Sequence, residues 1–176
     1  MSTQLQQACQ SYLGSRISDY AFRCRRFRVV YNELVRMGFA RGDSVLDLGA
    51  GRQDFKRFLR EQGWYGLYVP IDGAIDGTDL NTWSPSEMAD FVVAIEVAEH
   101  LLDPYRFLAK ATRAARRGCV MTTPNPEVVD VIACDPTHVS VVDPQHPYLR
   151  EWVLSRHNLF GLEGDTLVAR YWRFTR

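Results

Sequence analysis

Hydrophobic residues form two kinds of pattern along the chain. The first, near the N-terminus, has the period of a helix. Between residues 17 and 37 an apolar side chain recurs every three or four positions, which places these side chains on one stripe of a helix. The stripe consists of Ile17, Ala21, Cys24, Phe27, Tyr31, Leu34 and Met37. Gly38 and Gly42 follow it, and glycine is common just after a helix end. We therefore expect residues 1–43 to form a helical lead-in.

Short runs of consecutive apolar residues come next, and they alternate with helical patterns. A run of this kind is typical of a strand buried on both faces of a parallel sheet. The predicted strands cover residues 45–48, 67–71, 91–96 and 119–122, and the predicted helices cover residues 53–62 and 103–117. Asp103 and Pro104 suit the start of the second of these helices, and Gly118 suits its end. Pro70 has no N–H to donate, so we expect its strand near an edge of the sheet, with the next strand short or missing.

The C-terminal part of the chain predicts a further helix over residues 149–156. A closing hairpin is expected from residues 159–162 and 167–174, around Gly164-Asp165. Together these elements predict an α/β fold, with a mostly parallel sheet between layers of helices. We expect a single domain over residues 1–176, made of the lead-in, 1–43, and a core, 44–176.

The composition narrows the classes of protein to which the chain can belong. Of its 176 residues 46% are hydrophobic, enough for one globular core, and no apolar run approaches the roughly 20 residues that span a membrane. The 21 basic and 21 acidic residues balance, so general nucleic-acid binding is not expected. Residues 1–10 are polar without a signal-peptide pattern, and the four cysteines show no metal-ligand spacing. We expect a cytoplasmic protein with reduced thiols and no membrane partner.

Arginines gather in the lead-in at Arg23, Arg25, Arg26 and Arg28. A cluster of this kind is typical of a solvated helix face. The alternative is a basic patch that binds an anionic substrate. The sequence leaves both interpretations open.

The first predicted strand runs directly into a glycine turn, Gly49-Ala50-Gly51, and then into a helix. This arrangement holds a nucleotide-like ligand at the carboxyl edge of a parallel sheet, because glycine lets the backbone bend sharply and approach the ligand. Asp47, at the end of the strand, is a candidate partner for an amino group of the ligand. Asp54 stands where the dinucleotide fingerprint has its third glycine, and a carboxylate there opposes a pyrophosphate at the helix start. An NAD-linked enzyme is therefore disfavoured.

The pattern Asp-x-Gly-x-Gly at residues 47–51 resembles motif I of the class I S-adenosylmethionine-dependent methyltransferases. The resemblance implies a Rossmann-like fold with S-adenosylmethionine as cofactor. Asp72 follows Gly49 by 23 positions, at the tip of the second predicted strand, where an acidic residue accepts the ribose hydroxyls. The resemblance also implies that Asp79 meets the adenine amino group. The cofactor-binding residues expected in all are Asp47, Gly49, Ala50, Gly51, Asp72, Gly73, Asp79, Leu80 and Glu96.

A second polar group follows the third predicted strand. Glu96, Glu99 and His100 lie at the edge of the sheet where ligands bind, and two carboxylates with an imidazole suit Mg²⁺ or Mn²⁺. The pattern Glu-x-x-Glu-His is similar to those of two metal-dependent O-methyltransferase families, one in ubiquinone biosynthesis and one that methylates the 2′-hydroxyl at the 3′ end of small RNAs. The second family also has a later histidine, to which His138 corresponds, and Thr123-Pro124-Asn125 resembles both families. The metal ligands implied are Glu96, Glu99, His100 and His138.

The alternative to the metal site needs no ion. Metal-free members of the superfamily carry a pair like Glu99-His100 at this helix start, where it caps the helix or orients the substrate. In that case His138 or His100 is the candidate catalytic base for an acceptor hydroxyl. The sequence thus predicts a methyltransferase for a small molecule or a terminal hydroxyl. The alternative function is a catalytically silent partner or scaffold subunit that keeps the fold and the cofactor pocket.

Overall fold

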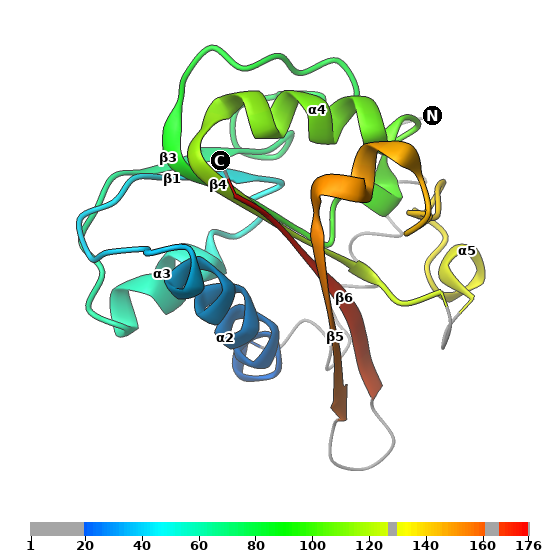
Figure 1. Cartoon of the computed structure of the whole chain (residues 1–176), viewed down its shortest axis with the longest axis horizontal. Coiled ribbons are helices and arrows are strands. Elements are labelled where there is room, and N and C mark those ends of the chain that lie inside the picture. The colour runs from blue at the N-terminus through cyan, green and yellow to red at the C-terminus, as the bar shows by residue number, and fades with distance from the viewer. Residues whose placement is uncertain (1–19, 127–129, 161–165, 176) are drawn as a thin grey trace.

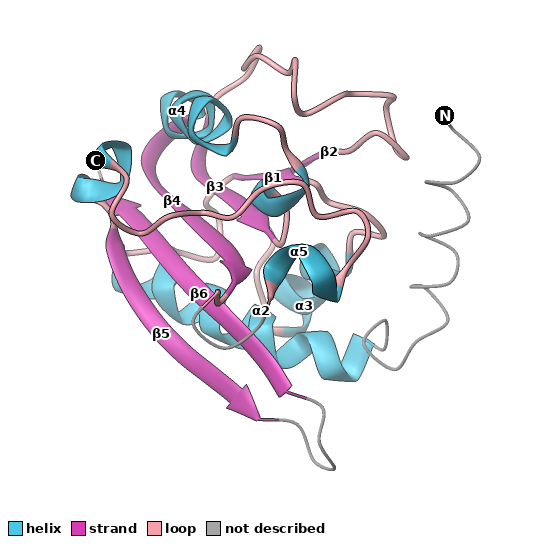
Figure 2. Ribbon diagram, turned by 90° about the vertical axis from the view of Figure 1, so that its right-hand side faces the viewer, coloured by secondary structure: helices cyan, strands magenta, loops and turns pink. Residues whose placement is uncertain are grey.

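The computed structural model describes residues 20–126, 130–160 and 166–175, and its strands form one mixed sheet (Figure 1). The strand order within these residues is β2-β1-β3-β4-β6-β5. Four neighbouring strands are parallel: β1 (Val45–Leu48), β2 (Tyr68–Ile71), β3 (Ala89–Ile95) and β4 (Ala115–Pro124). β6 (Thr166–Thr175) pairs antiparallel with both β4 and β5 (Val153–Phe160). The predicted α/β fold with a closing hairpin is confirmed, and Figure 2 shows the hairpin at one edge of the sheet.

Helices cover both faces of this sheet. The helices are α2 (Tyr20–Arg36), α3 (Asp54–Glu61), α4 (Pro104–Ala114) and α5 (Val131–Cys134), with short 3₁₀ turns at η2 (Ala98–His100) and η3 (Pro147–Glu151). α2 and α3 lie on one face and α4 lies on the other (Figure 1). Each face of the sheet has its own hydrophobic core, and β1 contributes to both because successive side chains of a strand point to opposite faces. Val45 packs with α2 and α3, whereas Leu46 and Leu48 pack with α4. Among the described helices, none combines the length and hydropathy that crossing a membrane requires.

Most of the predicted elements are present near their expected bounds. β2 lies at the edge of the sheet, and an edge strand tolerates Pro70, which has no N–H to donate to a neighbouring strand. Residues 72–88 are all described and contain no strand, so the sheet ends at β2. The predicted lead-in helix is confirmed from Tyr20 onward, and residues 1–19 lie outside the described part of the chain.

The helix predicted over residues 103–117 is too long by three residues. α4 ends at Ala114, and β4 starts at once with Ala115, which pairs with Ala89 of β3. Arg117 explains why the strand begins so early. Its guanidinium bonds to the Asp43 carboxylate and to the carbonyl of Gly38, both at 2.7 Å, and this holds the segment in the sheet.

The helix predicted over residues 149–156 is wrong. η3 ends at Glu151, and residues 153–160 form β5, which pairs with β6 along its whole length. The local apolar pattern of the segment is also compatible with a strand. Its backbone groups are satisfied by a distant partner strand, and such tertiary pairing overrides local propensity.

Candidate active site

The order of the strands places a topological switch point at the carboxyl ends of β1 and β3. The connection from β1 leads to β2 on one side, and the connection from β3 leads to β4 on the other. The order of the strands across the sheet therefore reverses between β1 and β3, although the two strands are parallel. Ligands of open α/β sheets bind at such a switch point. The glycine turn follows β1 and Glu96 follows β3, so both predicted polar groups meet at this edge.

The two glycines of the turn meet different demands. Gly49 has φ +79°, donates to the carbonyl of Ile71 at 2.8 Å, and is packed so tightly that a Cβ there would lie 2.4 Å from Cγ2 of Val97. Gly51 has φ +48°, but no described atom lies within 4 Å of the place of its Cβ. Packing therefore requires a glycine at position 49, whereas Gly51 leaves open space beside the backbone, as close approach by a ligand needs.

Asp72 lies at the tip of β2, against the glycine turn. Its Oδ2 accepts from the backbone N–H of Gly51 at 2.9 Å, and its Oδ1 accepts from Ala74 N–H at 2.8 Å. A carboxylate oxygen has more than one lone pair, so both oxygens can still accept from a ribose hydroxyl. The open space at Gly51 and this carboxylate fit the nucleoside part of S-adenosylmethionine.

Asp47 lies in β1 and contacts the neighbouring β2. Its side chain is buried on the face of the sheet covered by α3, the residue is 3% exposed, and it accepts a hydrogen bond from the Tyr68 hydroxyl. Burial raises the pKa of Asp47 to about 7; Asp72 adds to this rise, and the Tyr68 bond opposes it. The carboxylate is therefore buried against Tyr68, and its expected contact with the ligand's amino group stays a prediction.

Asp79 organises the loop beyond β2. Its exposed carboxylate accepts from the backbone N–H of Asn81 at 2.9 Å and from the Asn81 side-chain amide at 3.1 Å. The side-chain oxygen Oδ1 of Asn81 accepts in turn from Leu102 N–H at 2.9 Å, which joins this loop to the segment after η2. Leu80 packs against the core on the α4 face, and Gly73 is exposed. The adenine contact of Asp79 stays a prediction.

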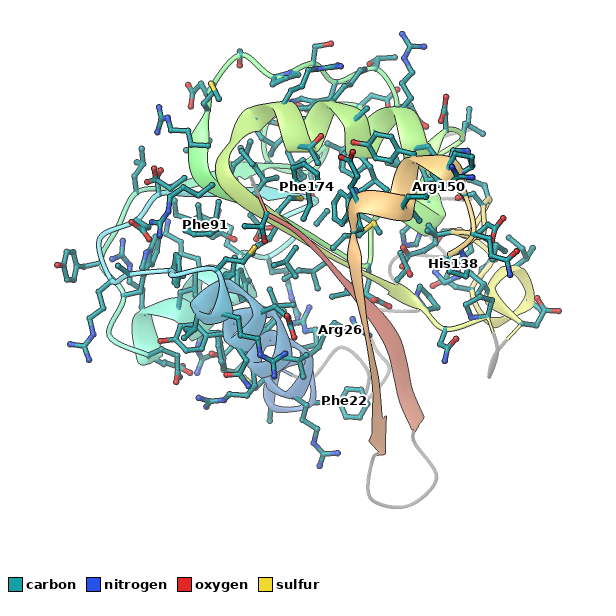
Figure 3. The ribbon with its side chains drawn as sticks, viewed as in Figure 1. Phe22, Arg26, Phe91, His138, Arg150 and Phe174 are labelled. Carbon is teal, nitrogen blue, oxygen red and sulfur yellow. The ribbon has the colours of Figure 1, made fainter. Side chains whose placement is uncertain are left out.

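The structure brings Glu99, His100 and His138 together. Each offers one ligand atom, and these atoms lie within 4.8 Å of one another. The distant His138 reaches η2 because the next two backbone N–H groups, of Val139 and Ser140, donate to the Glu99 carbonyl at 2.8 and 3.0 Å. Figure 3 shows His138 on this segment, next to α5.

Hydrogen bonds set the tautomers of the two imidazoles. Nδ1 of His138 lies 2.6 Å from the Val131 carbonyl, and Nδ1 of His100 lies 3.2 Å from the Thr137 carbonyl. A carbonyl only accepts, so each Nδ1 carries the proton and each Nε2 carries a lone pair. The rings meet edge-on with centroids 4.7 Å apart. Burial, and after it the neighbouring His138, lowers the pKa of His100, so this imidazole is neutral at pH 7.

Glu99 is the least satisfied polar group of the site. It is 1% exposed, and neither carboxylate oxygen has a hydrogen-bond partner among the described residues. Its Oε1 lies 4.0 Å from Nε2 of His138. Burial, with the nearby charge of Glu96, raises the pKa of Glu99 well above its usual range. One carboxylate and two imidazoles with lone pairs fit a divalent cation such as Mn²⁺, which would supply the missing partner.

Glu96 does not join this cluster. It has φ +55°, accepts at Oε1 from the Thr122 hydroxyl at 2.7 Å, and has its Oε2 3.3 Å from Nη2 of Arg26. The predicted four-residue metal set is therefore corrected to three residues. Sequence reasoning missed the roles of Arg26 and Thr122. The arginine cluster in the lead-in was the available signal for Arg26.

Comparison with known proteins identifies the family of the chain. A family model described as "Methyltransferase domain" matches residues 22–163, which is more than half of the chain. No curated protein matches the sequence significantly.

Several solved structures share the fold. The plantazolicin methyltransferase BpumL in complex with S-adenosylhomocysteine superposes with a TM-score of 0.70 at 10% identity, covering 99% of this chain and 91% of that one. A SAM-dependent methyltransferase from Archaeoglobus fulgidus gives 0.60 at 18% identity, covering 85% and 94%. Magnesium protoporphyrin IX methyltransferase from Synechocystis PCC 6803 with bound S-adenosylhomocysteine gives 0.58 at 12% identity, covering 99% and 95%. At these identities the likeness is one of fold.

Proposed function

The chain belongs to the methyltransferase domain family, with the class I fold of S-adenosylmethionine-dependent enzymes, and from this premise we propose that it methylates a hydroxyl of a small molecule or a terminal group. The observation that carries the proposal is the cluster of the buried Glu99 with the half-buried His100 and His138 at the carboxyl end of β3. It stands beside a glycine turn with open space for a cofactor. A hydroxyl needs help to lose its proton, and this cluster has the groups to provide it.

Each part of the site has a defined task in this proposal. When bound, S-adenosylmethionine supplies a methyl group activated by its sulfonium. The turn around Gly51 admits the cofactor, and Asp72 accepts hydrogen bonds from its ribose hydroxyls. His138 and His100 each keep a lone pair on Nε2, so either imidazole can take the acceptor's proton, and the lowered pKa of His100 keeps that ring neutral at pH 7. Positioning the acceptor in line with the methyl group then lowers the barrier by several kcal/mol.

A divalent ion is the second way to remove the proton. Glu99, His100 and His138 would hold it, and a bound ion would favour the ionised form of an acceptor hydroxyl. The two arrangements use the same residues but differ in their response to chelation. Loss of activity in EDTA with recovery in Mg²⁺ or Mn²⁺ supports the ion. Activity that survives EDTA and disappears in His138→Ala supports the imidazole alone.

The similar enzymes of known structure support a small or terminal acceptor. The matched structures include enzymes named for plantazolicin and for magnesium protoporphyrin IX. The balanced charge of 21 basic and 21 acidic residues also argues against a polyanionic substrate.

The test has two stages. Titration calorimetry should show heat on adding S-adenosylhomocysteine, and absence of heat would overturn the proposal. A labelled cofactor should then transfer its methyl group to a member of a hydroxyl-bearing acceptor pool, and alanine in place of the base, in His138→Ala or His100→Ala, should abolish the transfer. His146→Ala is the matched control, because His146 stacks on Tyr105 outside the cluster. Binding without transfer to any acceptor would favour the silent partner subunit instead.

A further inference from the structure

Two oxygen atoms of Thr137 lie within hydrogen-bond distance of the His100 imidazole. Nδ1 of His100 is 2.9 Å from the hydroxyl oxygen Oγ1 of Thr137 and 3.2 Å from the carbonyl oxygen of the same residue. A carbonyl only accepts, whereas a hydroxyl can either donate or accept. The carbonyl therefore favours a proton on Nδ1, but the closer hydroxyl is compatible with a proton on either ring nitrogen. The direction in which the hydroxyl donates decides whether the two contacts agree.

The carboxylate of Asp135 sets the direction of this hydroxyl. Its Oδ1 accepts from the Thr137 hydroxyl at 2.6 Å and from the Thr137 backbone N–H at 2.8 Å. Burial alone would raise the pKa of Asp135, but the hydrogen bonds from Thr137 lower it, so the group is ionised and only accepts at pH 7. The hydroxyl proton is thus committed to Asp135, and Oγ1 is left as an acceptor for Nδ1–H of His100.

The hydrogen bonds therefore run in one direction, from His100 through Thr137 to Asp135. With the proton on Nδ1, the lone pair is on Nε2, as both a general base and a ligand of a divalent ion require. A hydroxyl that donated to Nδ1 would place the proton on Nε2 and block either use. His138 needs no such relay, because its Nδ1 lies 2.6 Å from the carbonyl of Val131, which only accepts.

Closing the local turn does not by itself explain the position of Asp135. An aspartate that accepts from the N–H two residues further on forms a common turn. Other aspartates of the described chain make the same bond at 2.8–3.0 Å while their side chains stay exposed, namely Asp76, Asp79 and Asp143. Asp135 is instead buried, at 8% exposure, although burying a charge costs free energy. The hydroxyl bond toward His100 gives this buried carboxylate a task beyond the turn.

We propose that Asp135 is a positioning residue, which acts through the Thr137 hydroxyl to hold His100 in its Nδ1–H tautomer with the Nε2 lone pair free for the reaction. The use of that lone pair in methyl transfer rests on the proposed function. The tautomer itself is a property of the protein alone, so it can be measured without a methyl acceptor.

The first arm of the test measures the tautomer by nitrogen-15 NMR, in which protonated and unprotonated ring nitrogens have separate chemical shifts. Single His→Gln variants assign the signals of the four histidines, which are His100, His138, His146 and His157. The wild type should show His100 with its proton on Nδ1. In Asp135→Ala the hydroxyl is free to donate to Nδ1, so the ratio of Nδ1–H to Nε2–H should fall about fivefold, the effect of one hydrogen bond.

A second substitution separates this role from a structural one. Thr137→Val removes the competing donor and leaves the Thr137 carbonyl, so adding it to Asp135→Ala should restore the Nδ1–H tautomer of His100. Damage to the local structure would not be repaired in this way. Thr137→Ser keeps the hydroxyl and should behave as the wild type. Ser140→Ala is the matched control, because that hydroxyl bonds to the Ala98 carbonyl at 3.0 Å and not to an imidazole.

The second arm measures methyl transfer from the labelled cofactor. In Asp135→Ala kcat should fall with the fraction of the Nδ1–H tautomer, while KM for the cofactor stays unchanged, and Thr137→Val should restore kcat in the double variant. A folded Asp135→Ala protein with the wild-type tautomer would overturn the inference and leave the proposed function untouched. Failure of Thr137→Val to restore the tautomer would also overturn it. The expected tautomers in a wild type that methylates no acceptor would support the hydrogen-bond relay and overturn the proposed function.

Discussion

Gly49→Ala tests whether the glycine turn is fixed by packing against the segment after β3. The structure gives two reasons for a large loss of stability. At φ +79° the left-handed backbone costs a residue with a Cβ about 1–2 kcal/mol. The new Cβ would also lie 2.4 Å from Cγ2 of the buried Val97, and overpacking of this kind costs about 1–3 kcal/mol. We expect Gly49→Ala to lower the free energy of unfolding by about 2–5 kcal/mol.

A double-mutant cycle separates the two contributions. Val97→Ala removes the methyl group that the new Cβ would meet, so the overlap should disappear and the backbone strain should stay. Urea unfolding with linear extrapolation should then show the two substitutions to be non-additive by about 1–3 kcal/mol, with the double variant more stable than the sum predicts. Additivity within about 0.5 kcal/mol would refute the packing argument.

Gly51→Ala is the control within the same turn. Its φ of +48° carries the backbone cost, but no described atom lies within 4 Å of the place of its Cβ. The loss of stability should therefore stay near about 1–2 kcal/mol. Its affinity for S-adenosylhomocysteine should fall sharply, because the methyl group enters the space left for the ligand. If Gly51→Ala binds S-adenosylhomocysteine as the wild type does, the ligand does not bind beside Gly51.

Three further predictions follow from the same site. Asp72→Ala should weaken binding of S-adenosylhomocysteine at least tenfold, about 1.4 kcal/mol, as measured by calorimetry. The pKa of Asp47 is raised from 3.8 to about 7 in the folded chain, so its contribution lowers stability as pH rises between these values. Asp47→Asn keeps an acceptor for Tyr68 and should be more stable than the wild type above pH 7, by up to about 4 kcal/mol in urea unfolding, with no difference near pH 4. Mn²⁺ should raise the melting temperature of the wild type in scanning fluorimetry, and Glu99→Gln should abolish the rise.

Local sequence determined most of the fold of this protein. The apolar runs around Val45 and Phe91 are buried on both faces of a sheet, and a run of that length and composition has few other uses. Pro70 marked an edge strand because it lacks a donor whatever surrounds it. The glycine turn and Asp72 were also recognisable, since their tasks depend on backbone freedom and on spacing along one strand–helix unit.

Only the tertiary structure determined which residues far apart in the sequence pair with each other. Residues 153–160 become a strand because β6 pairs with them, although their local pattern also suits a helix. Asp47 turns to Tyr68, and Glu96 turns to Arg26 and Thr122 rather than toward Glu99. A residue's type limits which bonds it can make, but packing of separate elements determines which partner lies within reach. The sequence therefore determined which residues lie at the candidate active site, and the fold determined which of these residues contact one another.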